Sequence, residues 1–148
     1  MPSICQVDTL AIYSTSIKLP IKEIVANQLH YNLIVREVER KGILNFCQEN
    51  DVMLIAFRPL QKGFLAQDKD SLVGLLCQKY QKTSAQIALK WLLSKPNVVA
   101  IPKMASLPHL KENLAVFDWE IEKADLKKLQ EEYSNQQDVS EIFNLDKF

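Results

Sequence analysis

The feature that most constrains the fold is an alternation of short apolar runs with longer segments of helical spacing. The clearest run covers residues 52–57, six apolar residues in succession, and Arg58 and Pro59 close it. An unbroken apolar run of this length is typical of a parallel strand that is buried on both faces. Residues 25–30 and 98–101 form two further runs of strand length. The sequence therefore predicts parallel strands connected by helices.

Helical patterns occupy the segments between and after these runs. Residues 36–49 have helical spacing, although Gly42 lowers the helix propensity of that segment. Residues 70–80 are also predicted to be helical. The spacing of apolar side chains predicts two more helices, over residues 107–114 and 126–133.

One further helix has a clear start signal. Thr83 and Gln86 have the spacing of a capping box, in which each side chain bonds a backbone N–H of the other residue. Pro96 ends the helix that they open. Its apolar stripe consists of Ile87, Ala88, Trp91 and Leu92.

The predicted order is strand, helix, strand, helix, helix, strand, helix, helix. Such an order corresponds to right-handed βαβ units. Three strands are few, since a free-standing flavodoxin-like sheet has about five and a closed barrel has eight. We therefore expect the chain to be cut from something larger or to be completed by a partner. Its unpaired edge strands should also make it self-associate.

Charge and composition exclude several classes of protein. Lys plus Arg equals Asp plus Glu, at 18 each, so the basic excess of a nucleic-acid or membrane-surface binder is absent. The three cysteines are widely spaced and odd in number, which argues against a disulfide framework. No CxxC pair or His-rich tract indicates a metal. Without a signal-peptide pattern or an apolar run of membrane-spanning length, we expect a cytoplasmic protein.

Four segments, in the right order, resemble those of the aldo-keto reductase family. Residues 101–119, IPKMASLPHLKENLAVFDW, are similar to the family's C-terminal signature, I-P-K-S followed by R-I-x-E-N. Residues 25–28, VANQ, resemble the sixth strand of the family's barrel. Residues 56–60, AFRPL, resemble the end of the seventh strand, and residues 82–91, KTSAQIALKW, resemble the helix before the eighth.

This resemblance implies an α/β fold, the C-terminal half of a (β/α)8 TIM barrel with about three to four parallel strands. Residues 1–134 would form this half-barrel, and residues 135–148 a C-terminal tail. The first residues can be laid on the family's S-N-F segment after strand five. Ser3 then fits, and Ile4 replaces an asparagine that holds the nicotinamide carboxamide. The chain would begin inside the fifth strand.

The resemblance also implies that the cofactor is NADP (NADPH), bound at the carboxyl ends of the strands. Lys103 and the helix that Ser106 caps would hold the adenosine 2′-phosphate. Met104 and His109 stand where the family usually has serine and arginine. An imidazole cannot supply a guanidinium fork, so we expect weaker NADP affinity and less discrimination against NAD. The alternative is a solvated lysine beside a surface helix.

The resemblance assigns the nicotinamide end of the cofactor to the strands predicted over residues 25–30 and 52–57. By resemblance, Gln28 contacts the carboxamide and Phe57 stacks on the nicotinamide ring. The loop after the seventh strand, with Arg58 and Lys62, would hold the pyrophosphate. The alternatives are an interior amide for Gln28, a core role for Phe57 and solvated loop charges. The complete predicted cofactor set is Gln28, Phe57, Arg58, Leu60, Lys62, Lys103, Met104, His109, Glu112 and Asn113, of which the last two match adenine-edge contacts.

Carbonyl reduction requires a hydride and a proton donor at the developing alkoxide. The family uses a tyrosine, a lysine, an aspartate and a histidine from the first four strands, and the resemblance covers none of these. His30 is not a substitute, and no tyrosine has a matching Lys/Asp context: Tyr13, Tyr31, Tyr80 and Tyr133. We therefore expect no catalytic residue, no metal and no turnover by the chain alone.

Three hypotheses follow. The chain is part of an NADP-dependent oxidoreductase that acts on carbonyls and alcohols. Alternatively, it is a non-catalytic nucleotide-binding or interaction module that complements a separate N-terminal half. The third hypothesis is a general α/β module without a nucleotide role. The segment from Lys103 to Asn113 separates the first two hypotheses from the third.

Overall fold

A four-stranded parallel sheet forms the centre of the protein. The computed structural model describes residues 3–5, 24–60 and 71–133, and the structural statements below concern these residues. The strands are β1 (Ser3–Cys5), β2 (Ile24–His30), β3 (Met53–Phe57) and β4 (Val98–Ile101), and they lie side by side in chain order. All three strand pairs are parallel. The predicted parallel sheet is confirmed, and its four described strands are one more than the apolar runs predicted and within the three to four that the resemblance implied.

At β3 and β4, only one face of the sheet is well covered. Leu54 and Ala56 in β3 are fully buried, whereas Met53 on the opposite face is 45% exposed. Ile101 in β4 is 47% exposed. The prediction that residues 52–57 form a strand buried on both faces is therefore wrong for the described residues. In a closed barrel the inward side chains are covered by layers from opposite strands, and here only four strands are described.

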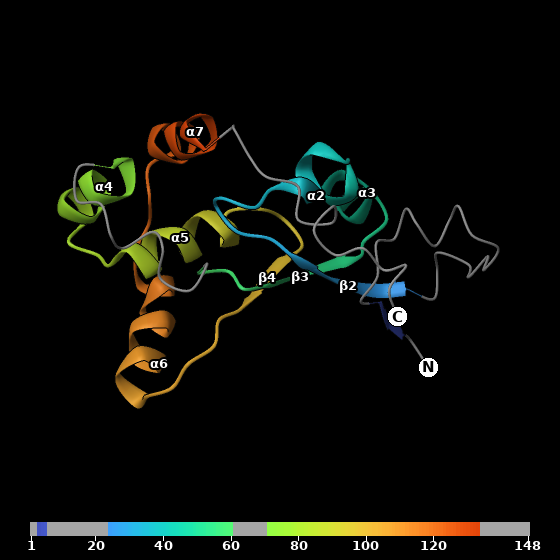
Figure 1. Ribbon diagram of the computed structural model, residues 1–148, viewed down its shortest axis with the longest axis horizontal. Helices are drawn as coiled ribbons and strands as arrows, with labels where there is room; N and C mark the ends of the chain where they lie inside the picture. Colours follow the sequence, from blue (N-terminus) through green and yellow to red (C-terminus); the bar gives the residue numbers. More distant parts are fainter. Residues whose placement is uncertain (1–2, 6–23, 61–70, 134–148) are drawn as a thin grey trace, which may run out of the picture.

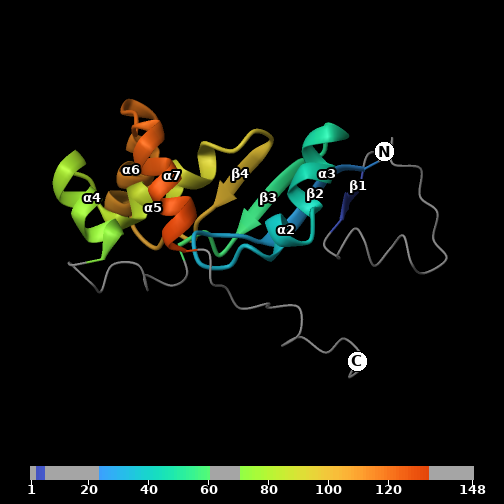
Figure 2. The same ribbon diagram turned by 90° about the horizontal axis from the view of Figure 1, so that it is seen from above.

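Helices and one short 3₁₀ helix accompany the sheet. In chain order they are α2 (Glu37–Arg40), α3 (Ile43–Glu49), α4 (Leu72–Tyr80), α5 (Ser84–Leu93), α6 (Leu107–Leu114), the 3₁₀ helix η3 (Ala115–Asp118) and α7 (Lys123–Glu132). Helices α2, α3 and α7 lie on one side of the sheet (Figure 1). Seen from above, α4, α5, α6 and α7 gather at one end of the molecule (Figure 2).

The single helix predicted over residues 36–49 is wrong, because Gly42 divides it. Gly42 has a φ of 71°, a left-handed conformation that costs little only for a residue without a Cβ. Helix α2 therefore ends after Arg40, and α3 begins at Ile43. The break turns Ile43, Leu44 and Cys47 into the core.

Local cap signals set the starts of the next helices. The Thr83 hydroxyl accepts from the backbone N–H of Gln86, and the Gln86 side chain accepts from the backbone N–H of Thr83. The capping box is thus confirmed. Its helix buries the predicted stripe, in which Ile87, Ala88, Trp91 and Leu92 are fully buried. Helix α4 begins in the same way, since the Ser71 hydroxyl accepts from the N–H of Gly74.

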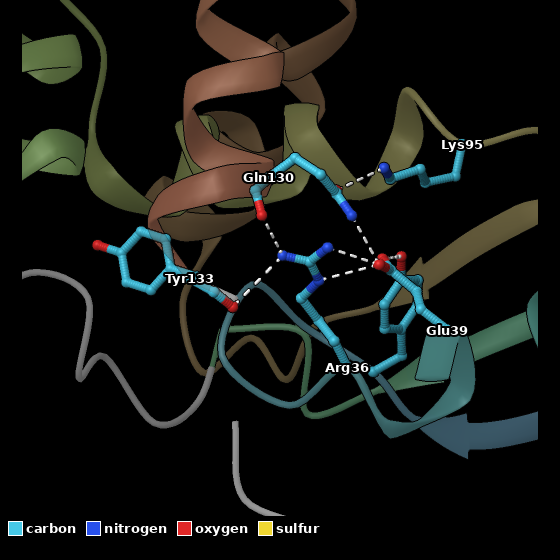
Figure 3. Close-up of polar contacts among 6 residues, drawn as sticks. Arg36, Glu39, Lys95, Gln130 and Tyr133 are labelled. Carbon is cyan, nitrogen blue, oxygen red and sulfur yellow. Dashed lines mark hydrogen bonds and ion pairs between the residues drawn. The ribbon is translucent and has the colours of Figure 1, made fainter. Parts of the chain in front are cut away.

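A buried polar cluster joins the start of α2 to the end of α7 (Figure 3). The Arg36 guanidinium donates to the backbone oxygens of Gln130 at 2.8 Å and Tyr133 at 3.4 Å. It also pairs with the Glu39 carboxylate at 2.6 Å, and the Gln130 amide donates to that carboxylate at 2.7 Å. Lys95 donates to the Gln130 side chain. Arg36 thereby satisfies carbonyls of the last turn of α7 that no helical N–H can reach.

The Glu39 carboxylate also accepts a hydrogen bond from the hydroxyl of Tyr31. Burial, followed by the negative charge of Glu39, holds the pKa of Tyr31 well above its usual value. Two cations of this cluster also contact the Trp91 ring, with the Arg36 guanidinium 5.2 Å and the Lys95 ammonium 4.8 Å from its centroid. Burial lowers the pKa of Lys95. The cluster therefore combines charge pairing with aromatic packing.

Candidate functional site

Three strands end at one edge of the sheet. His30 in β2 pairs with Phe57 in β3, and Phe57 pairs with Ile101 in β4. These are the last residues of their strands. Because the strands are parallel, their carboxyl ends form a common edge, where α/β barrels bind ligands. The predicted residues of β2, β3 and the segment after β4 therefore belong to one end of the sheet.

Gln28 and Phe57 lie on the same face of this edge. Gln28 pairs with Ile55, and Ile55 and Phe57 are two residues apart on β3, so their side chains share one face. His30 shares the face for the same reason. Gln28, His30 and Phe57 are all half-buried. The sequence does not assign His30 to the cofactor set, although its two-residue spacing from Gln28 indicates a shared face.

The rings of His30 and Phe57 are stacked, with centroids 5.1 Å apart and planes 23° from parallel. Asn32, which is fully buried, lies beside them: its amide nitrogen is 3.2 Å from Nε2 of His30 and donates to the Arg58 carbonyl at 3.0 Å. Asn32 was not identified from the sequence. A polar residue just past a strand end was the available signal, but its partner is 26 residues away.

The loop after β3 begins with a strained residue. Arg58 has a φ of 50°, which is uncommon for a residue with a Cβ, and its side chain is exposed. The bond from Asn32 to its carbonyl helps to hold that conformation. Leu60 is half-buried and packs against the hydrophobic core. Lys62, the remaining predicted residue of this loop, lies outside the described residues.

Lys103 follows the end of β4 by two residues, and its side chain is exposed. The predicted cap is present, since the Ser106 hydroxyl accepts from the backbone N–H of His109. Met104 is 41% exposed, and His109 is exposed as well. In Figure 1 the segment after β4 runs away from the sheet before α6 turns back towards α5. Lys103 and the start of α6 thus form an open surface rather than a closed pocket.

Glu112 and Asn113 lie near the end of α6, and both are half-buried. The side-chain amide of Gln86, whose oxygen completes the capping box of α5, donates to the backbone oxygen of Glu112 at 3.0 Å. This bond ties α6 to the start of α5. The position of α6 is therefore anchored even though none of its own side chains is fully buried.

One tyrosine departs from the prediction that no tyrosine has a Lys/Asp context. The Tyr80 hydroxyl donates to Asp125 at 2.7 Å, and Lys79 pairs with the same carboxylate at 2.7 Å. The Lys79 ammonium, then Tyr80, hold the pKa of Asp125 well below its usual range. However, the Tyr80 oxygen also accepts from the N–H of Glu122 and so caps α7. The trio joins α4 to α7 rather than serving the carboxyl edge of the sheet.

Within the described ranges, no helix is long and apolar enough to cross a bilayer. The same ranges hold no cluster of three or more His, Cys, Asp or Glu side chains that suits a metal ion. The carboxyl edge instead offers stacked rings, an amide and exposed cations. This chemistry suits a ligand with an aromatic ring at one end and an anionic group at the other.

Comparison with known proteins identifies the family. The sequence model of the Aldo/keto reductase family matches residues 4–133 of this chain. Methylglyoxal reductase YeaE of Escherichia coli K12 is 34% identical over 110 residues, which cover 72% of this chain and 38% of that protein. Aldo-keto reductase family 1 member D1 of Oryctolagus cuniculus is 32% identical over 97 residues, or 60% of this chain and 29% of that protein.

Solved structures give the same result. The thermostable aldo-keto reductase Tm1743, in complex with the inhibitor epalrestat, superposes with a TM-score of 0.71 and 38% identity over 82% of this chain and 43% of that one. An aldo-keto reductase from Klebsiella pneumoniae, in complex with NADPH, gives a TM-score of 0.74 and 28% identity over 90% of this chain and 48% of that one. The chain therefore spans less than half the length of each of these four proteins.

Proposed function

The chain belongs to the aldo-keto reductase family, and from that premise we propose that it forms the NADP-binding portion of a carbonyl or alcohol oxidoreductase. The observation that carries the proposal is the order of groups along one sheet edge. Gln28 and Phe57 share a face at the carboxyl ends of β2 and β3, and Lys103 follows β4 at the same end. A dinucleotide carries an aromatic carboxamide at one end and, in NADP, a phosphate at the other.

Each end of the dinucleotide is assigned to its own residues. The Gln28 amide holds the carboxamide, and the Phe57 ring stacks on the nicotinamide. Lys103 and the N-terminus of α6 hold the 2′-phosphate, with Met104 and His109 beside them. Arg58, Leu60 and Lys62 approach the pyrophosphate, while Glu112 and Asn113 contact the adenine. The aldo-keto reductase from Klebsiella pneumoniae in complex with NADPH supports the choice of cofactor.

The chain by itself is proposed to bind the cofactor without reducing a carbonyl. Among the described residues, the carboxyl edge holds no tyrosine with a lysine and an aspartate, since the Tyr80 trio serves the α4–α7 contact. Catalysis then depends on side chains from a complementary half-barrel. The exposure of Met53 and Ile101 on the uncovered face of the sheet supports such a partner.

Calorimetric titration tests the proposal directly. NADPH and NADH are titrated into the full chain and into Lys103→Ala, with Lys127→Ala on the solvent face of α7 as the control. An exposed cation contributes modestly, so Lys103→Ala should weaken NADPH binding by about two- to ten-fold and leave NADH binding unchanged. Lys127→Ala should change neither. Incubation of the chain with NADPH and methylglyoxal should consume no cofactor.

Absence of NADPH binding up to millimolar concentration would refute the cofactor role. Equal losses of NADPH and NADH in Lys103→Ala would remove the assignment of the 2′-phosphate to Lys103. Cofactor oxidation by the isolated chain would refute its dependence on a second half.

A further inference from the structure

The ring of His30 covers the place that the proposed function gives to the nicotinamide. Gln28, assigned to the carboxamide, lies on β2, so a nicotinamide that reaches it approaches Phe57 from the β2 side. His30 is also on β2, is paired with Phe57 and stacks on it with centroids 5.1 Å apart. We propose that His30 occupies the nicotinamide-stacking face of Phe57 and must swing away before the nicotinamide half of the cofactor docks. This inference rests on the proposed function.

A hydrogen bond from Asn32 holds the imidazole in this position. The Asn32 side-chain oxygen accepts from the backbone N–H groups of Ile34 at 2.9 Å and Val35 at 2.7 Å, which identifies its other atom as the NH₂ group. That NH₂ donates to the Arg58 carbonyl and lies 3.2 Å from Nε2 of His30. Because an amide NH₂ only donates, Nε2 accepts, and the imidazole is neutral with its proton on Nδ1.

The turn at Asn32 is therefore held by several hydrogen bonds, whereas the imidazole of His30 is able to rotate away from Phe57. Asn32 is fully buried and bonded through both side-chain atoms, but His30 is half-buried at the end of its strand. Rotation of His30 about its side-chain bonds breaks the contact with the Asn32 amide and the stack on Phe57, and the bonds from Asn32 to Ile34, Val35 and the Arg58 carbonyl do not depend on it. The sheet edge can thus open without any change in the backbone.

This arrangement acts on the two halves of the cofactor differently. The adenosine end uses Lys103 and α6, beyond β4, and does not involve His30. A ligand with only the adenosine end binds without disturbing the stack, whereas NADPH must break it. An aromatic pair of this kind corresponds to about a two- to ten-fold effect on Kd. His30 is therefore a specificity-determining residue that weakens the dinucleotide relative to its adenosine fragment.

The experiment compares two probes by calorimetry on the full chain. NADPH carries the nicotinamide, and adenosine 2′,5′-bisphosphate lacks it. His30→Ala should tighten NADPH binding by about two- to ten-fold, and His30→Phe, which strengthens the stack, should weaken it by a similar factor. Neither variant should alter the binding of the bisphosphate. His109→Ala, at the chain's other histidine, is the matched control and should affect both probes in parallel.

The outcomes separate this inference from the function on which it rests. If the wild-type chain binds both probes and the ratio of their Kd values is unchanged in both His30 variants, the inference is overturned and the function stands. If the wild-type chain binds neither probe, the proposed function fails. The stack has its own readout, because Phe57→Leu should shift the imidazole C–H resonance of His30, identified as the one retained in His109→Ala. An unshifted resonance would overturn the stack itself.

Discussion

Replacement of Arg36 by methionine should be among the most destabilising single changes in the described part of the chain. The Arg36 side chain is only 8% exposed and serves three groups: the Glu39 carboxylate, the last turn of α7 and the Trp91 ring. Methionine keeps much of the packing volume but supplies no donor or charge. The change therefore isolates the polar contribution of Arg36.

The size of the loss follows from what the change leaves behind. Breaking a buried ion pair by removing one partner costs roughly 3–5 kcal/mol. Glu39 is 18% exposed and keeps two donors, Gln130 and Tyr31, which lowers that figure. The freed carbonyls of α7 lie at a helix end and can turn to water. We expect a loss of about 2–4 kcal/mol in the free energy of unfolding.

Urea denaturation followed by circular dichroism measures this loss. Lys127→Ala is the control, because the Lys127–Glu131 pair spans 3.7 Å with both side chains mostly exposed and should contribute under about 0.5 kcal/mol. In the double variant with Glu39→Gln, the combined loss should be smaller than the sum of the single losses, since the two residues share one interaction. An Arg36→Met protein as stable as the Lys127→Ala control would refute this reasoning.

Two further changes test the local signals at helix ends. Thr83→Ala should lower the free energy of unfolding by about 1 kcal/mol, because it removes the acceptor of the Gln86 N–H, and Ser84→Ala should lower it less. Asp125 contributes stability through an ionised carboxylate whose pKa is held low by Lys79 and Tyr80. That contribution is complete above the unfolded-state pKa of about 3.9 and is lost as the pH falls below it. Urea midpoints should therefore drop more steeply below about pH 4 in the wild type than in Asp125→Asn; parallel profiles would contradict this.

Features that depend on neighbours in sequence could be predicted well. The capping box of Thr83 and Gln86 and the cap at Ser106 each need only a hydroxyl three residues before a backbone N–H. Strands β3 and β4 could be predicted for a similar reason, since each is an apolar run closed by a proline, which is a local signal. The structure confirms these elements, and Lys103 lies past the end of β4, as the apolar run implied.

Features that depend on distant partners could not be predicted. Arg36 reads as an ordinary charge at a helix start, because its acceptor on Gln130 is 94 residues away. The two-residue spacing puts His30 on the face of Gln28, but its stack on Phe57 depends on the register between β2 and β3. The break at Gly42 had a local signal, since glycine disfavours a helix. However, a helix can also continue through a glycine. The break at this position depends on the burial of Ile43, Leu44 and Cys47 against distant parts of the chain, which the sequence alone does not reveal.

The two ends of the proposed cofactor site differ in how ready they are to bind. At the adenosine end, the Ser106 cap and the bond from Gln86 to Glu112 already fix α6, and Lys103 is exposed. At the nicotinamide end, His30 covers Phe57. A ligand that meets both ends therefore gains its first contacts at the adenosine end, where no group has to move. Docking of the ring then follows as an intramolecular step at high effective concentration. Because only that step displaces His30, removal of the imidazole should alter the affinity for the complete dinucleotide and not the initial capture of its phosphate.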